Sequence, residues 1–179
     1  MFDNIKDFFR KRRLNKVACK TPTGFLPLEK ITSANIMIDV EEPGFDQLKE
    51  EILTWGRTSG VKTNIYFLDL RRLGKEELLL TSIQTTILKK ELDWLGYPPA
   101  DKINTLTAER TDLFVSMVDR TCPAVDIICK CANAQFKIGR KAYEGHAFDM
   151  IISGSPTEDL RSDSKLIFKT MLELVAKIQ

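Results

Sequence analysis

This sequence has little histidine, and it lacks long apolar runs and metal-binding cysteine spacings. It holds one histidine and four cysteines, and Cys129 and Cys131 lie one residue too close for a C-x-x-C pair. A zinc site is therefore not expected, and no metal is predicted. No stretch approaches the roughly 18 apolar residues that span a bilayer, and no apolar run of about 7–15 residues follows the N-terminal charges as in a signal peptide. These absences predict a cytoplasmic protein with free thiols.

Phosphate-binding glycine motifs are missing as well. Neither G-x-G-x-x-G nor a P-loop occurs, so the sequence points to no cofactor. Internal repeats and low-complexity tracts are also lacking. A hydrophobic content of 43% and a charged content of 29% are ordinary for a globular protein. The net charge of +2 favours no particular partner.

Charge is unevenly distributed along the chain. Residues 1–20 carry seven Lys or Arg and two Asp, a net of +5, which leaves −3 for the remainder. We therefore expect a basic N-terminal arm over residues 1–20 and a single α/β domain over residues 21–179.

The arm has the pattern of an amphipathic helix. From Phe2 to Leu14, apolar side chains recur at positions 2, 5, 8 and 9, and Lys and Arg gather toward the C-terminal end. One interpretation is a helix whose phenylalanines dock on the main domain. A second is a membrane-surface helix, because basic residues beside Phe are typical of one. A third is nucleic-acid binding through the arginines, although no strong nucleic-acid signal is present. The partner prediction is thus membrane or protein contact through residues 1–16, and the oligomeric state stays open.

Apolar runs that alternate with amphipathic segments predict an α/β domain. The clearest signal is a β-α-β opening with a strand at Ala34–Val40, a helix at about Phe45–Arg57 and a strand at Val61–Leu70. Residues 71–100 show no clear pattern. The other predicted elements are a helix at Asp101–Arg110, a strand at Thr111–Val118, a helix at Pro123–Ala132, strands at Ala134–Arg140 and Phe148–Ser153, and a long helix at Thr157–Ile178.

The stretch from Thr111 to Ser155 is predicted to form the packed centre of the domain. Within it, residues 141–147 alone separate two predicted strands, which is too short for the crossover that adjacent parallel strands require. The two strands are therefore expected either to form an antiparallel edge hairpin or not to be neighbours. The predicted fold is a three-layer α/β/α sandwich with a mostly parallel, Rossmann-like sheet.

Several segments resemble a known group of proteins. The segments FFRKRRLNK, LDWLGYP, DLFVSM, ANAQFKIGR and FDMIIS are similar to those of an uncharacterised bacterial family of small α/β proteins. The resemblance covers nearly the whole chain, but its motifs are structural. It implies a Rossmann-like fold and supplies no catalytic residues.

Three aspartates, Asp39, Asp69 and Asp119, come at or just after predicted strand ends. In open α/β sheets, ligands bind at the carboxyl ends of the strands where the topology switches. Convergent carboxylates there can hold a divalent cation or a sugar hydroxyl, or act as a general base. The alternative for each aspartate is a structural role, in which its side chain accepts backbone amides of the following turn.

Cys122 and Ser155 are the other candidate ligand-binding residues. Cys122 precedes Pro123, a favoured first helical residue, and a helix N-terminus lowers the pKa of a thiol. Its general base would have to be the only histidine, His146. Ser155 precedes the last predicted helix, where it either binds a phosphate or caps the helix. A structural capping role is the alternative for Cys122 too.

The segment Gly139–Lys141 carries local positive charge and is predicted to be a solvated hairpin turn.

The functional prediction follows from these patterns. No nucleophile–base pair, metal spacing or phosphate loop is recognisable, so no catalytic residue is assigned and a non-catalytic binding or scaffold module is favoured. One alternative is an enzyme or small-molecule-binding domain whose site comprises Asp39, Asp69, Asp119 and Cys122. The other is a peripheral membrane or nucleic-acid binder that acts through the arm.

Overall fold

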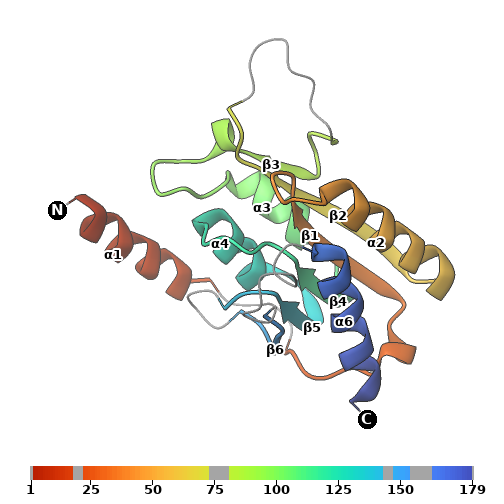
Figure 1. Cartoon of the computed structure of the whole chain (residues 1–179). Helices are drawn as coiled ribbons and strands as arrows, with labels where there is room; N and C mark the ends of the chain where they lie inside the picture. Colours follow the sequence, from red (N-terminus) through yellow and green to blue (C-terminus); the bar gives the residue numbers. More distant parts are fainter. Residues whose placement is uncertain (1, 18–21, 73–80, 143–146, 154–162, 179) are drawn as a thin grey trace.

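A six-stranded, all-parallel sheet forms the centre of the computed structural model, which describes residues 2–17, 22–72, 81–142, 147–153 and 163–178 (Figure 1). The strands are β1 (Ser33–Asp39), β2 (Lys62–Asp69), β3 (Thr86–Leu88), β4 (Thr111–Ser116), β5 (Ala134–Gly139) and β6 (Met150–Ile151). The helices are α1 (Phe2–Asn15), α2 (Phe45–Ser59), α3 (Ala100–Thr107), α4 (Pro123–Cys131) and α6 (Ser164–Lys177), with short 3-10 turns at Leu28–Lys30 and Lys89–Glu91.

The β1–α2–β2 opening is confirmed. β1 alternates its side chains between the two faces of the sheet, so that Ile36 packs into one core and Met37 into the other. α2 ends where Gly60 adopts a φ of 71°, a left-handed conformation that favours glycine. The chain then enters β2, which pairs with β1 in parallel over its length.

Helices cover both faces of the sheet, which confirms the three-layer sandwich. α2 and α6 pack on one face through a core that includes Leu48, Ile52 and Phe168. α3 and α4 pack on the other face, and α1 lies outside α4 (Figure 1). Leu14 near the end of α1 is buried in that second core.

The strand order is β3-β2-β1-β4-β5-β6. The chain builds the sheet outward from β1 to β3, then returns to the other side of β1 and continues from β4 to β6. This is the order of Rossmann-type doubly wound sheets. The direction of winding reverses between β1 and β4, so the topological switch point lies at the carboxyl ends of these two strands.

The relationship between β5 and β6 was predicted wrongly. The two strands are neighbours and run parallel, with Ile138 opposite Met150 and Gly139 opposite Ile151. The connection is short enough because β6 pairs only with the carboxyl end of β5. The chain therefore runs back along β5 by only about two residues before β6 begins. Full-length parallel neighbours require a connection that runs back along the whole strand.

Two segments differ from the sequence-based boundaries. In the unreadable region 71–100, the structure places the short strand β3 beside β2. The last helix, α6, begins at Ser164, where the Asp163 carboxylate caps it by accepting the Leu166 amide at 3.0 Å. Residues 154–162, which include the predicted start of this helix, lie outside the described residues.

Candidate functional site

The loops that follow β1 and β4 meet at the switch point. Backbone hydrogen bonds continue past both strands, from the Val40 amide to Leu68 O at 2.9 Å and from the Met117 amide to Met37 O at 2.8 Å. The loop after β1 then turns back on itself, with the Glu42 amide donating to Asp39 O at 3.2 Å. Of these bonds, the one from Met117 to Met37 holds the end of β4 beside β1, so that the two loops start next to each other.

Asp39, the last residue of β1, is buried with 5% of its surface exposed. Its Oδ1 accepts the Glu41 amide at 2.9 Å, as in the turn-forming role considered for this residue. Burial raises the pKa of the Asp39 carboxyl above its usual value, and it outweighs the lowering effects of the Glu41 amide and the Arg120 guanidinium.

Arg120 connects the two loops. Its Nη2 donates to Asp39 Oδ1 at 2.9 Å, its Nε lies 2.6 Å from Asp39 Oδ2, and its Nη1 lies 2.6 Å from Glu41 Oε2. The planar guanidinium thus contacts both oxygens of Asp39 and one of Glu41, a geometry that suits arginine better than lysine. Arg120 and Glu41 are each 36% exposed, so this pair faces solvent while Asp39 lies beneath it.

Arg140 forms a second ion-pair group beside the first. Its Nη1 lies 2.6 Å from Glu42 Oε1 and donates to Ser164 Oγ at 3.0 Å, and its Nη2 lies 3.5 Å from Asp119 Oδ2. The side chain is only 2% exposed. The prediction of a solvated turn at Gly139–Lys141 is therefore wrong for Arg140, because the parallel β5 directs it toward the acidic loop after β1.

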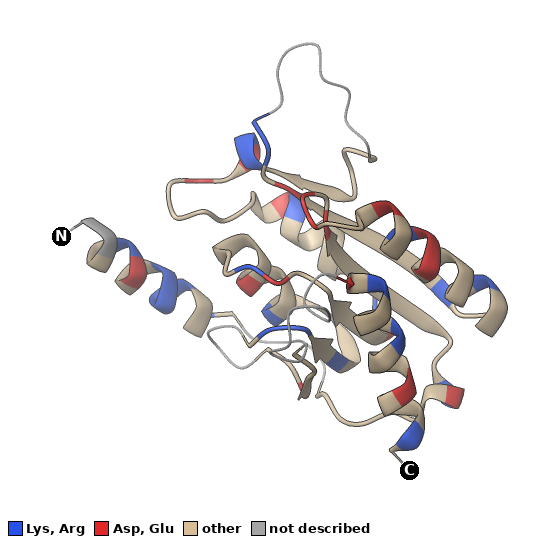
Figure 2. Ribbon diagram, in the orientation of Figure 1, with Lys and Arg blue, Asp and Glu red and all other residues tan. Residues whose placement is uncertain are grey.

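A pocket of about 320 Å³ opens between the two loops. Its lining side chains are Asp39, Glu41, Glu42, Pro43, Asp119 and Arg120. The structure therefore brings two of the predicted site residues, Asp39 and Asp119, into one pocket. We call these six residues the switch-point pocket. Acidic side chains gather in this region, whereas Lys and Arg predominate on α1 (Figure 2).

Asp69 does not line this pocket. It ends β2, and its side chain is fully buried in a two-point contact with Arg71, in which Nε donates to Oδ1 at 2.9 Å and Nη2 to Oδ2 at 2.7 Å. The Arg71 side chain holds the pKa of the Asp69 carboxyl below its usual value. The Asp69 Oδ1 also accepts the Arg71 amide at 3.2 Å, so its described contacts are those of a turn-forming residue.

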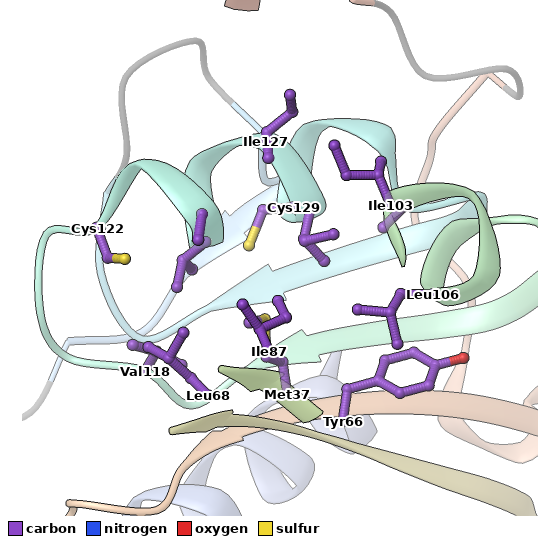
Figure 3. Packing of buried hydrophobic residues seen from close by; sticks show 14 of the residues in the cluster. Met37, Tyr66, Leu68, Ile87, Ile103, Leu106, Val118, Cys122, Ile127 and Cys129 are labelled. Atoms are coloured by element: carbon purple, nitrogen blue, oxygen red, sulfur yellow. The ribbon is translucent and has the colours of Figure 1, made fainter. Parts of the chain in front are cut away.

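Cys122 lies in the core and not in the pocket. It is 5% exposed among the residues beneath α4, together with Val118 and Leu68 (Figure 3). Burial raises the pKa of its thiol, against the lowering effect of the Val125 and Ala124 amides at the start of α4. The expectation of a thiol pKa lowered by the helix N-terminus is therefore wrong. His146 and Ser155, the other residues of those hypotheses, lie outside the described residues.

The sequence reasoning missed Glu41, Glu42 and Arg120 of the pocket, and it also missed Arg140 beside it. Glu41 and Glu42 directly follow the first strand, and Arg140 directly follows an apolar run, just as the three chosen aspartates do. Charge at strand ends was the available signal, but it was interpreted as a binding signal only for the aspartates, and Arg140 was assigned to a solvated turn. Within the described ranges, no group of three or more Asp, Glu, His or Cys side chains is placed to hold a metal ion.

One protein family matches the chain over residues 6–170. The chain belongs to this family. It is the family of unknown function DUF6913, in line with the resemblance to an uncharacterised family. No curated protein and no solved structure shows significant similarity to this DUF6913 member. In the part of the chain that the structure describes, none of the helices combines the length and apolar character needed to cross a membrane.

Proposed function

We propose that this protein is a non-catalytic binding module whose switch-point pocket takes a small organic cation, that is, a molecule with a protonated amine or a guanidinium group. The main support for this proposal is the composition of the pocket. Four carboxylates and one arginine line a space of about 320 Å³ at the carboxyl ends of β1 and β4. The lining side chains thus have a formal charge of −3. Carboxylates at the switch point of an open sheet are well placed to bind a ligand there.

The contacts of Arg120 support a cationic ligand. This side chain shows that the carboxylates of Asp39 and Glu41 together accommodate a guanidinium, with contacts of 2.6 to 2.9 Å. Asp119 is 46% exposed on the other side of the pocket. A ligand amine bound between Glu41 and Asp119 therefore meets negative charge on two sides, with the buried Asp39 beneath.

An anionic ligand is disfavoured at the same place. The start of α2 would otherwise attract a phosphate, because helix N-termini carry partial positive charge. Here Glu41 and Glu42 lie four and three residues before the start of α2 and repel an anion. Arg120 and Arg140 are paired with the four carboxylates, and these six groups together still carry a net charge of −2, which repels an anion. The pocket therefore lacks the electrostatics of a dinucleotide site despite the Rossmann-type strand order.

Cytoplasmic location is part of this proposal. Cys122 and Cys129 are buried thiols outside any disulfide, which is the state that a reducing compartment maintains.

Isothermal titration calorimetry at low ionic strength tests the ligand class. The cationic probes are spermidine and free arginine, and the anionic probe is NAD. We expect the cations to bind and NAD not to bind. The substitution Glu41→Gln is expected to weaken cation binding by up to about fivefold, because a partly exposed charge contact contributes roughly 0.2–1 kcal/mol. Added salt should weaken binding as well.

Glu50→Gln is the matched control. Glu50 is exposed on α2 and does not line the pocket, so its loss should leave the affinity unchanged. An equal loss in both variants would show that the cations bind through overall charge only. Binding of NAD in preference to spermidine, or binding of neither cation, would overturn the proposal.

A further inference from the structure

The N-terminal helix α1 is fixed to the domain by its second half. Leu14 is buried, Arg10 Nε donates to Leu95 O at 2.8 Å, and Tyr97 Oη donates to Arg10 O at 3.1 Å. The Arg13 guanidinium lies 4.7 Å from the centre of the Tyr97 ring. Its Nη1 also donates to Asp93 Oδ2 at 2.8 Å. The docking interpretation of the arm is therefore correct for this half of the helix.

The first half of α1 directs apolar side chains away from the domain. Ile5, Phe8 and Phe9 are 47%, 61% and 42% exposed. Trp94, from the loop against which α1 docks, is 61% exposed and lies edge-on to Phe9 at a ring separation of 5.9 Å. Phe8 contacts Phe9 at 5.6 Å. We call Ile5, Phe8, Phe9 and Trp94 together the aromatic patch. Phe8 and Phe9 thus do not cover the domain as the docking interpretation expected.

Positive charge lies on the same side of the helix as the patch. Arg12 follows Ile5, Phe8 and Phe9 by seven, four and three residues, which places all four on one helical face, and Lys16 continues that face. Residues 2–16 carry six Lys or Arg and two Asp. Of these aspartates, Asp7 is paired with Arg10 at 3.0 Å. In Figure 2 the ribbon of α1 carries more blue than red.

We infer that the aromatic patch and the basic residues of α1 bind the surface of an anionic lipid bilayer. Aromatic side chains at the level of the headgroups and Lys and Arg attracted by anionic lipids are the two contributions that hold interfacial helices. The helix stands at the edge of the molecule with its N-terminal end outward (Figure 1). Phe8 and Trp94 are each 61% exposed, so both side chains are available for shallow insertion. The resulting attachment is reversible, because four apolar side chains make a small anchor.

Other occupants fit these observations less well. A second copy of the chain would bring a like-charged helix against this one, which is unfavourable. A stable protein interface usually covers about 800 Å² on each partner, more than four side chains supply. Single-stranded nucleic acid stacks its bases on parallel, open ring faces, whereas Phe9 packs edge to face against both Phe8 and Trp94, and Ile5 offers no ring at all.

Vesicle co-sedimentation of the full chain tests the inference. Binding is expected to vesicles of phosphatidylcholine mixed with anionic phosphatidylserine, and much less to phosphatidylcholine alone. Phe8→Ser should weaken binding roughly tenfold or more, because a buried Phe contributes about 1.5–3 kcal/mol. Arg12→Gln should weaken it about fivefold, the value of one basic residue near an anionic surface. The fluorescence emission of Trp94 should shift to the blue on binding, and this shift should vanish in Trp94→Phe.

Matched variants separate the patch from general effects. Ile83→Ser removes an exposed apolar side chain outside the patch, and Lys30→Gln removes an exposed charge on a 3-10 turn. Both should bind vesicles as the unaltered protein does. Absence of binding to anionic vesicles, or equal losses in Ile83→Ser and Phe8→Ser, overturns the inference. Binding of a single-stranded oligonucleotide without vesicle binding overturns it in favour of nucleic acid, and a dimer in solution that Phe8→Ser dissociates overturns it in favour of self-association.

Discussion

Arg140 and Glu42, which lie 98 residues apart in the sequence, form an ion pair in which only 2% and 15% of their side-chain surfaces are exposed. The Ser164 hydroxyl donates to the same Glu42 oxygen at 2.6 Å. One carboxylate thus joins the end of β5, the loop before α2 and the start of α6. Glu42, which lines the switch-point pocket, is therefore held in place by Arg140 and Ser164 without any bound ligand.

Removal of this arginine should destabilise the fold. Arg140→Met leaves the Glu42 charge largely buried without its ion pair, so the free energy of unfolding should fall by about 3–5 kcal/mol. Urea unfolding followed by circular dichroism measures this loss. Arg57→Met, at an exposed arginine of α2, is the control and should change stability little. The double variant Glu42→Leu/Arg140→Met should lose less than the single one, because it leaves no largely buried carboxylate unpaired; Asp119, the other partner of Arg140, is 46% exposed. Equal stability of the two single arginine variants would contradict the structural role of the pair.

The Asp69–Arg71 pair gives a pH-dependent contribution to stability. Because the folded-state pKa of Asp69 is lowered, the carboxylate stabilises the fold fully above its unfolded pKa of about 3.9 and loses this effect as the pH falls through the lower folded value. Asp69→Asn should cost roughly 1–3 kcal/mol at neutral pH, the range for a hydrogen bond to a charged group. The difference from the unaltered protein should stay constant down to about pH 5 and shrink below about pH 4.

Urea unfolding at several pH values measures this difference. Glu173→Gln, at an exposed glutamate on α6, is the control and should show a small effect at every pH. A cost of Asp69→Asn that persists unchanged in acid would show that it arises from packing and not from the charge.

Thiol reactivity should follow burial. Cys122 and Cys129 are buried, and burial raises the pKa of both thiols, so little thiolate forms near neutral pH. Cys131 is partly exposed at the end of α4. Alkylation with iodoacetamide, mapped by mass spectrometry, should modify Cys131 before Cys122 and Cys129, and unfolding should remove the order. Faster labelling of Cys122 in the folded protein than in the unfolded chain would instead support the hypothesis that Cys122 is a nucleophile.

The sequence predicted those parts of the fold that depend on local pattern. The apolar run at Ala34–Val40 and the amphipathic stretch at 45–57 give β1 and α2 directly, because strand alternation and helical spacing are visible in one segment. β3 was missed because Thr86–Leu88 is only three residues long and is a strand through its pairing with β2. The direction of β6 was predicted wrongly for a related reason, since its pairing partner and not its own residues sets the direction.

For the candidate site too, the sequence predicted what depends on local pattern and not what depends on the strand order. Asp39 and Asp119 could be placed at strand ends from the sequence, and the strand order then brought both into one pocket. The partners of the two arginines could not be foreseen, because they depend on β1 lying beside β4 and on β4 lying beside β5. For Cys122, the local effect of the helix start was identified correctly but is outweighed by burial in the core.

The parallel edge formed by β5 and β6 depends on Gly139. The ring of Phe148 lies against this glycine at the place where a β-carbon would be, so Gly139→Ala forces the ring or the edge strand to move. Such overpacking costs about 1–3 kcal/mol. Gly24→Ala is the control, because open space surrounds the Gly24 position. Thermal unfolding should show a clear loss for the first variant and little change for the second.

A second substitution and an exchange measurement locate the effect. Phe148→Leu in the Gly139→Ala background should recover part of the lost stability, because the smaller side chain vacates the space that the new methyl group needs. Hydrogen exchange should accelerate at the Asp149 and Ile152 amides, which donate to Lys137 O and Gly139 O across the β5–β6 pair at 2.9 Å each. If exchange there were unchanged while stability fell, the alanine would be acting elsewhere. Arg140 follows Gly139 directly, so a shift of this edge should also weaken cation binding in the switch-point pocket, which links the small strand β6 to the site it does not touch.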